Sequence, residues 1–229
     1  MTDAAAHLAH FDALYADDPD PWDYEADPLE RRKRAVVLAA LGSGPLGLGA
    51  ELGCGPGVAT AEMAPRFARL LAIDGAVGAA TLARERTAGH PNVTVRRAPL
   101  PPALRPRSVD AIIATEVLYY LPPAILDRTL TTCRAALRPG GRFVSTNSLT
   151  RFDDAEVSNA ALSRRQRAVF GPPLRTVVGA GWRCDVFGAR RGLGPGPASR
   201  SRTAPRASPG SATRRSQVVS PLGFEPRTY

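Results

Sequence analysis

Residues 48–57 read Leu-Gly-Ala-Glu-Leu-Gly-Cys-Gly-Pro-Gly, and this stretch decides the fold. An apolar run gives way to Gly53, Gly55 and Gly57, which predicts a strand that turns sharply into a helix. Glycines suit such a turn because a Cβ atom would block positive φ or hold a ligand away from the backbone. The segment therefore predicts the start of a βαβ unit with a ligand site at the turn.

A second signal lies 21 positions after the first of these glycines, at Asp74. This residue ends another apolar run, Leu70-Leu-Ala-Ile-Asp, and its carboxylate can accept hydrogen bonds from both hydroxyls of a ribose. With the glycine turn it predicts a nucleoside site at the carboxyl ends of adjacent parallel strands. The alternative is a glycine-rich turn beside a solvated acid.

The glycine spacing favours one class of nucleoside. The dinucleotide fingerprint G-x-G-x-x-G holds a pyrophosphate at a helix amino terminus. Here Val58 stands where the third glycine is expected when counting from Gly53, and the chain has G-x-G-x-G preceded by Glu51. This departure counts against NAD and an oxidoreductase, and it favours S-adenosylmethionine, which carries no diphosphate.

Length and composition indicate one domain followed by a basic tail. The 229 residues are enough for a real core. Of the net charge of +9, +7 falls on residues 190–229, so the preceding body is nearly neutral and lacks a basic stripe typical of nucleic-acid binding. Cys54, Cys133 and Cys184 form no C-x-x-C pair. We expect a cytoplasmic protein with no metal site and no nucleic-acid or membrane partner.

Apolar periodicity predicts strands that alternate with helices. We expect strands near residues 48–52, 69–74, 92–97, 109–114 and 141–147. We expect helices near residues 3–16, 29–41, 58–67, 76–87, 122–137 and 153–169, the last capped by Asp153 or Asp154. This alternation predicts an α/β fold with a doubly wound, mostly parallel sheet covered on both faces.

Residues 190–229 change abruptly to Gly, Pro, Ser, Ala and Arg. Such a composition predicts disorder, because it cannot bury enough apolar surface to offset the entropy of ordering. The last eight residues resemble the peptide that is produced when a reading frame runs through a transfer-RNA gene. We therefore favour a frameshifted or read-through tail over a genuine basic tail that docks on RNA or a membrane.

Four motifs in order resemble the class I S-adenosylmethionine-dependent methyltransferases. They are the turn at residues 51–57, Asp74, the apolar strand at 108–113 and the turn at 137–144. Residues 11–24 and 115–121 are also similar to the NodS-type methyltransferases. The resemblance implies a Rossmann-like fold and an enzyme that N-methylates a small molecule. The expected acceptor is an amino sugar or a chitooligosaccharide. An O-methyltransferase and a non-catalytic protein that binds the cofactor are the alternatives.

The resemblance also divides the chain into three parts. Residues 1–45 are expected to form amino-terminal helices and a cofactor lid, residues 46–189 the methyltransferase core, and residues 190–229 the tail. The family sheet ends with a sixth strand, which we place at residues 181–187, and an antiparallel seventh strand. Because the tail stands where the seventh strand is expected, we expect that strand to be missing or disrupted and the fold to be weakened.

The residues assigned to methyl transfer follow the expected fourth strand. Glu116 stands just past that strand, where its carboxylate can accept the proton of an amine. Tyr119 and Tyr120 can line the acceptor site or face the sulfonium with their rings. The alternatives are an acid bound to backbone amides and tyrosines that only pack. This chemistry requires no metal.

The residues assigned to the cofactor come from several segments. An acid that holds adenine in many class I enzymes is absent here, so Ala98 and Leu100 are expected to do so through backbone groups and packing. One of Arg31, Arg32 and Lys33 is expected to reach the methionine carboxylate, and we choose Arg32. The cofactor-binding set is Trp22, Arg32, Glu51, Gly53, Cys54, Gly55, Gly57, Asp74, Ala98, Leu100 and Glu116.

Overall fold

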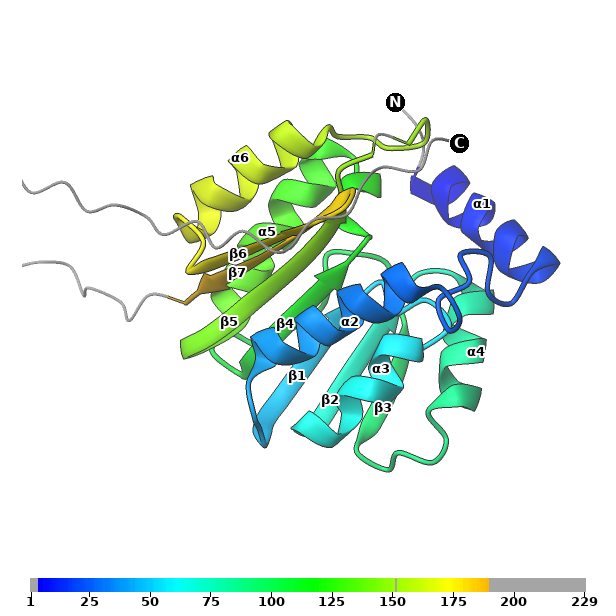
Figure 1. Cartoon of the computed structure of the whole chain (residues 1–229), viewed down its shortest axis with the longest axis horizontal. Helices are drawn as coiled ribbons and strands as arrows, with labels where there is room; N and C mark the ends of the chain where they lie inside the picture. Colours follow the sequence, from blue (N-terminus) through cyan, green and yellow to red (C-terminus); the bar gives the residue numbers. More distant parts are fainter. Residues whose placement is uncertain (1–3, 151, 190–229) are drawn as a thin grey trace, which may run out of the picture. The chain divides into compact units, whose positions relative to one another are not determined.

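A seven-stranded sheet with the order β3-β2-β1-β4-β5-β7-β6 runs through the molecule (Figure 1). The computed structural model describes residues 4–150 and 152–189, which belong to one compact unit. The strands are β1 Leu46–Leu52, β2 Phe67–Asp74, β3 Val93–Arg97, β4 Val109–Thr115, β5 Leu137–Ser148, β6 Arg175–Gly179 and β7 Trp182–Gly188. Six of these seven strands run in the same direction and β7 runs in the opposite direction, which confirms the predicted mostly parallel sheet.

Helices cover both faces of the sheet. Helices α2 and α3 contribute to the core on one face, and α5 and α6 contribute to the core on the other. The helices are α1 Ala4–Asp17, α2 Pro28–Leu41, α3 Val58–Met63, α4 Val77–Arg86, α5 Pro123–Ala136 and α6 Asn159–Phe170, with short 3-10 helices η1 Ala64–Arg66 and η2 Leu118–Tyr120. The architecture is the doubly wound α/β fold that the sequence predicts.

The core follows the two-residue period of β4. Ala111 and Ile113 join a buried cluster with α2 and α3, whereas Ile112 and Ala114 join a second cluster with α5 and α6. All four side chains are fully buried. A central parallel strand is covered on both faces, so it reads as a continuous apolar run and not as an alternating pattern.

The expected loss of the last antiparallel strand is wrong. Strand β7 lies between β5 and β6 and pairs antiparallel with both, so the buried amides of this region have ladder partners. Residues 182–188 form this inserted strand and not the sixth. The true sixth strand, β6, precedes it and is joined to it by the turn at Ala180 and Gly181. Strand β6 was not predicted because it is a short edge strand of five residues that is mostly exposed, so it lacks a clear apolar pattern.

The predicted start of α6 is also wrong. The helix begins at Asn159, and the Ser158 side chain accepts a hydrogen bond from Ala161 N. Asp153 and Asp154 therefore lie in the loop before the helix and do not cap it. A serine hydroxyl satisfies an amide of the first turn as well as a carboxylate does.

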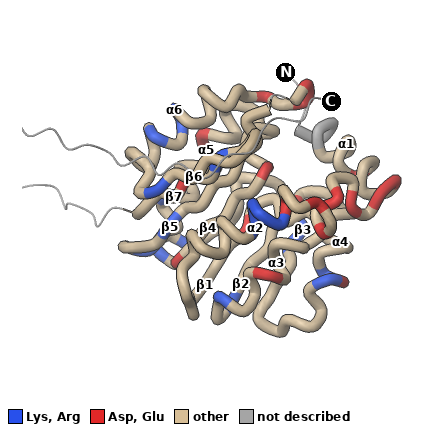
Figure 2. The backbone as a smooth tube through the Cα atoms, viewed as in Figure 1, with Lys and Arg blue, Asp and Glu red and all other residues tan. Residues whose placement is uncertain are grey.

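The acidic residues of the amino-terminal segment are concentrated between α1 and α2. Figure 2 shows these residues gathered along the connection between α1 and α2. Within the described residues, no helix combines the length and apolar character needed to cross a bilayer. The predictions of disorder and of a read-through origin for residues 190–229 lie outside the described residues.

The strand order identifies where a ligand is expected. Strand β1 pairs with β2 on one side and with β4 on the other, so the order of the strands reverses between β1 and β4. In open α/β sheets, ligands bind beyond the carboxyl ends of the strands at such a switch point. The glycine turn, Asp74 and Glu116 all follow strands that end there.

Candidate active site

The turn after β1 requires glycine both in conformation and in space. Gly53, Gly55 and Gly57 have positive φ angles of 68°, 52° and 81°. A Cβ atom at Gly53 would lie 2.6 Å from a methyl group of Val117, and one at Gly55 would lie 2.9 Å from the Tyr15 hydroxyl oxygen. Side chains are therefore excluded from the turn, and bare backbone reaches the cavity at the first two glycines.

Backbone amides fix Asp74 at the carboxyl end of β2. Its Oδ2 accepts a hydrogen bond from Gly55 N at 2.9 Å, and its Oδ1 accepts one from Ala76 N at 3.0 Å. Burial raises the pKa of this carboxyl above its usual value, and the backbone donors partly offset that effect. Each oxygen can accept a further hydrogen bond, so the carboxylate is prepared for the hydroxyl groups of a ligand.

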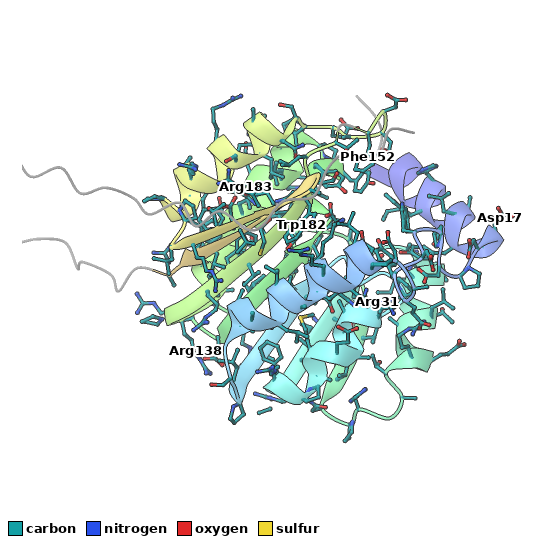
Figure 3. The ribbon with its side chains drawn as sticks, in the orientation of Figure 1. Asp17, Arg31, Arg138, Phe152, Trp182 and Arg183 are labelled. Atoms are coloured by element: carbon teal, nitrogen blue, oxygen red, sulfur yellow. The ribbon has the colours of Figure 1, made fainter. Side chains whose placement is uncertain are left out.

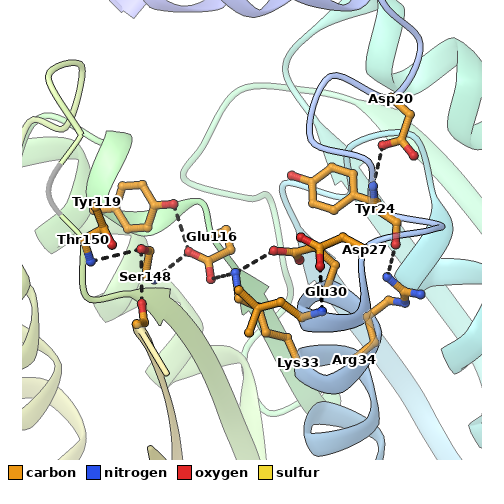
Figure 4. Close-up of polar contacts among 12 residues, drawn as sticks. Asp20, Tyr24, Asp27, Glu30, Lys33, Arg34, Glu116, Tyr119, Ser148 and Thr150 are labelled. Carbon is orange, nitrogen blue, oxygen red and sulfur yellow. Dashed lines mark hydrogen bonds and ion pairs between the residues drawn. The ribbon is translucent and has the colours of Figure 1, made fainter. Parts of the chain in front are cut away.

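Glu116 is held just after β4 by three partners (Figure 4). Its Oε2 accepts hydrogen bonds from the Tyr119 hydroxyl at 2.9 Å and from Ser148 N at 2.7 Å, while its Oε1 lies 2.9 Å from Lys33 Nζ. The residue has a φ of 54°, which a non-glycine residue adopts rarely. Glu116 thus binds a backbone amide, which was the alternative interpretation of this acid, and it also accepts a hydrogen bond from the Tyr119 hydroxyl.

Lys33 joins helix α2 to this cluster. Its ammonium also lies 2.6 Å from the Glu30 carboxylate, and only 7% of its side chain is exposed. Burial lowers the pKa of Lys33, but its attraction to Glu116 and its hydrogen bond with Glu30 outweigh burial and raise that pKa above its usual value. The ammonium is therefore shared between two carboxylates.

Aromatic rings close the cavity above these polar groups. The Trp22 ring lies 5.7 Å from both the Tyr15 and Tyr24 rings and 6.2 Å from the Phe11 ring, measured between centroids. The Phe11 ring in turn contacts Tyr120 edge to face at 5.1 Å. This chain of contacts links the amino-terminal segment to the loop after β4.

These elements enclose one cavity of about 500 Å³. That volume lies within the range of small-molecule sites. Eight of the residues predicted for the site line it: Trp22, Gly53, Gly55, Asp74, Leu100, Glu116, Tyr119 and Tyr120. The other five, Arg32, Glu51, Cys54, Gly57 and Ala98, are not among the described residues that line it.

The choice of Arg32 needs correction, because its side chain is exposed on α2 whereas Lys33 is buried and lines the cavity. The phase of the helix explains this. Lys33 stands four residues before Val37 and eight before Leu41, both buried, so it shares their face. The positions of these apolar residues were the signal that favours Lys33 over its neighbours.

Glu51 lies beneath the glycine turn. Only 2% of it is exposed, and its Oε2 accepts a hydrogen bond from the Thr60 hydroxyl at 2.6 Å. Burial raises the pKa of Glu51 to about 8. No cluster of His, Cys, Asp and Glu suited to a metal ion occurs in the described part of the chain.

Other lining residues were not predicted. Ser148 ends β5 and Thr150 follows it, and Ala180 and Gly181 belong to the turn between β6 and β7. The carboxyl-terminal hairpin, which was expected to be incomplete, thus forms part of the cavity wall. A sequence signal was present in the two β-branched or aromatic runs on either side of this short turn.

Comparisons with known proteins agree with this geometry. The family model of a methyltransferase domain matches residues 50–141. Nodulation protein S from Rhizobium tropici is 31% identical over 127 residues, which cover 55% of this chain and 53% of that protein. Nodulation protein S from Sinorhizobium fredii is 31% identical over 140 residues, which cover 60% and 63% respectively. The chain thus spans less than two thirds of the length of these curated relatives.

A solved structure gives the same fold. The N-methyltransferase NodS from Bradyrhizobium japonicum, in complex with S-adenosyl-L-homocysteine, matches with a TM-score of 0.68 and 23% sequence identity. The match covers 80% of this chain and 97% of that chain. The chain therefore shares the fold of this N-methyltransferase, and over the aligned stretches its sequence is similar to the two nodulation proteins.

Proposed function

We propose that this chain is an S-adenosylmethionine-dependent methyltransferase that methylates the nitrogen of a small-molecule amine. One observation carries the proposal: a single cavity joins the bare backbone of Gly53 and Gly55 and the carboxylate of Asp74 to the Glu116 cluster. A nucleoside cofactor and an acceptor can meet there because the cavity extends from one group of residues to the other.

The residues present fit this cofactor. Asp74 would accept hydrogen bonds from the ribose hydroxyls, and Leu100 and Val117 would pack against adenine. Lys33 replaces Arg32 as the cation proposed for the methionine carboxylate, because it alone of the three candidates lines the cavity. When bound, the cofactor supplies an activated methyl group on a sulfonium, so the protein's task is alignment and the exclusion of water.

The acceptor nitrogen must be uncharged to attack. We propose that Glu116 and Tyr119 contact the acceptor and orient it, since the Glu116 carboxylate is already held by Lys33, Tyr119 and Ser148 N. The acceptor would then lose its proton to solvent before it is enclosed. The aromatic rings around the cavity suit both the sulfonium and an ammonium.

The resemblance to NodS-type enzymes makes an amino sugar or a similar amine the acceptor to test first. The alternative of a non-catalytic protein that binds the cofactor rested on a missing strand, and β6 and β7 are both present in the described sheet.

The test is calorimetric binding of S-adenosylmethionine to the full chain, followed by mass spectrometry of a panel of amines incubated with both. We expect micromolar binding and a 14 Da addition per methyl transferred to nitrogen, as follows from replacing hydrogen by methyl. Binding without turnover of any amine would favour the non-catalytic alternative. Absence of cofactor binding by the folded chain would refute both.

A further inference from the structure

We infer that the acceptor is an amine that carries an apolar group about the size of a six-membered ring, and not a polyhydroxylated sugar. The inference rests on the proposed function and concerns the end of the cavity beyond Glu116. The side chains that form the walls of this end of the cavity restrict which class of amine can bind.

Topology separates this acceptor end from the cofactor end. Asp74 ends β2 and the glycine turn follows β1, whereas Glu116 follows β4, Ser148 ends β5 and Gly181 precedes β7. Neighbouring strands are about 4.8 Å apart, so the end of β5 stands roughly 14 Å, and the start of β7 roughly 19 Å, from the strand that would hold the ribose. A methyl donor anchored at Asp74 would leave this end of the cavity to the acceptor.

The walls of the acceptor end are apolar. Tyr120, Leu121, Ile125 and Phe152 line it, and the Tyr119 ring lies 4.5 Å from the Tyr120 ring and 5.7 Å from the Phe152 ring. Phe152 lies beyond β5 on the side toward α1 (Figure 3). The Tyr119 ring contacts the other two, and the three rings form one apolar wall of this end of the cavity, hereafter the slot; the flat face of an apolar group can lie against that wall.

The polar groups of this end are already engaged with one another. Ser148 Oγ accepts a hydrogen bond from Thr150 N at 3.1 Å, and Ser148 N donates to Glu116 Oε2. The Tyr119 hydroxyl donates to the same carboxylate. A sugar ring would bring several hydroxyl groups into a wall with few available partners, and an enclosed hydroxyl without a partner weakens binding.

The charges of the cavity favour an amine over an alcohol. Among the described lining residues the charged side chains are Glu30, Asp74, Glu116 and Lys33, so three carboxylates face one ammonium. The proposed cofactor carries one net positive charge, which leaves one negative charge without compensation. This negative charge would guide a protonated amine to the cavity before the amine loses its proton to solvent, whereas it would not guide a neutral alcohol.

The experiment compares 2-phenylethylamine, 2-phenylethanol and glucosamine as acceptors for the full chain with S-adenosylmethionine. We expect kcat/KM for 2-phenylethylamine to exceed that for glucosamine by about 100-fold or more, with no methylation of the alcohol. Equal or faster methylation of glucosamine would overturn the inference but leave the proposed function standing. Methylation of neither amine, with the cofactor bound, would overturn both.

A matched pair of variants tests the location. Phe152→Ala should lower kcat/KM for 2-phenylethylamine by about tenfold, because it removes one ring of the slot. It should leave the affinity for S-adenosylmethionine unchanged, which also shows that the variant is folded. Val178→Ala, at a position 58% exposed on β6, should alter neither quantity. An unchanged rate in Phe152→Ala, or an equal loss in both variants, would refute the assigned slot.

Discussion

Lys33 Nζ lies 2.9 Å from Glu116 Oε1, and both side chains are at least nine-tenths buried. One residue belongs to helix α2 and the other to the loop after β4, so this ion pair fastens the amino-terminal segment to the sheet across the cavity. A buried pair holds its two elements in register only while both partners remain, because either charge alone is costly to bury.

Lys33→Met should therefore lower the free energy of unfolding by about 3–5 kcal/mol, since it leaves Glu116 as an uncompensated buried carboxylate. The double variant Lys33→Met with Glu116→Gln should recover at least about 1 kcal/mol of that loss, because no charge is then stranded. Urea unfolding of Lys33→Met, of Glu116→Gln and of the double variant measures both quantities. Strict additivity of the two substitutions would show that the pair is not coupled.

Asp74→Ala should weaken the binding of S-adenosylmethionine by about 10- to 100-fold. The substitution removes a charged acceptor of two hydrogen bonds, and a loss of this size corresponds to about 1.4–2.8 kcal/mol in total. Asp127→Asn provides the control, because its carboxylate is half exposed on α5, away from the cavity. Calorimetry should find normal affinity in the control, and normal affinity in Asp74→Ala would contradict the assigned ribose contact.

The variant Glu116→Gln tests whether Glu116 orients the acceptor or accepts its proton. Loss of a general base lowers the rate by about 100-fold or more, whereas loss of an orienting carboxylate should lower kcat by about tenfold and leave the pH profile unchanged. We expect the second result, with activity rising with pH in both proteins as the acceptor loses its proton. If one limb of the pH profile disappeared in the variant but not in the unsubstituted chain, Glu116 would be the group that accepts the proton.

The glycine turn and Asp74 were predictable because their signals are local. The turn needs positive φ at residues adjacent in sequence, and Asp74 ends the next apolar run, so strand geometry alone brings them together. The Lys33–Glu116 contact was not predictable in this way. It joins residues 83 positions apart, and it depends on how α2 docks, which no local pattern encodes.

Two other predictions failed for different reasons. Arg32 and Lys33 differ by one position, and only the phase set by buried Val37 distinguishes them. Strand β6 has little buried surface of its own, so its sequence carries a weak pattern. Its place in the sheet comes from pairing with β7 and not from its own apolar residues.

Glu51 should make stability depend on pH. Its folded pKa is about 8, whereas an unfolded glutamate has a pKa of about 4.3. Between these values the unfolded chain has released the proton that the folded protein keeps, so raising the pH favours unfolding. Glu51→Gln should remove this contribution of about 1.4 kcal/mol per pH unit between pH 5 and 7.

The measurement is urea unfolding at pH 5, 6 and 7, with Glu85→Gln on the exposed surface of α4 as the control. The difference in unfolding free energy between Glu51→Gln and the unsubstituted chain should grow with pH, while the control should follow the unsubstituted chain. A difference that stays constant over this range would mean that Glu51 is ionised in the folded protein.

Truncation tests the assignment of the tail. A chain that ends at Gly192 keeps β7 and Ala189, whose amide donates to Gly141 O at 2.8 Å. It should bind S-adenosylmethionine with unchanged affinity. A chain that ends at Pro173 loses β6 and β7, which exposes the seven paired residues of β5 and removes the buried Trp182 from the core, so it should not fold. If the chain ending at Gly192 also lost binding, residues 193–229 would contribute to the protein and the read-through hypothesis would fail.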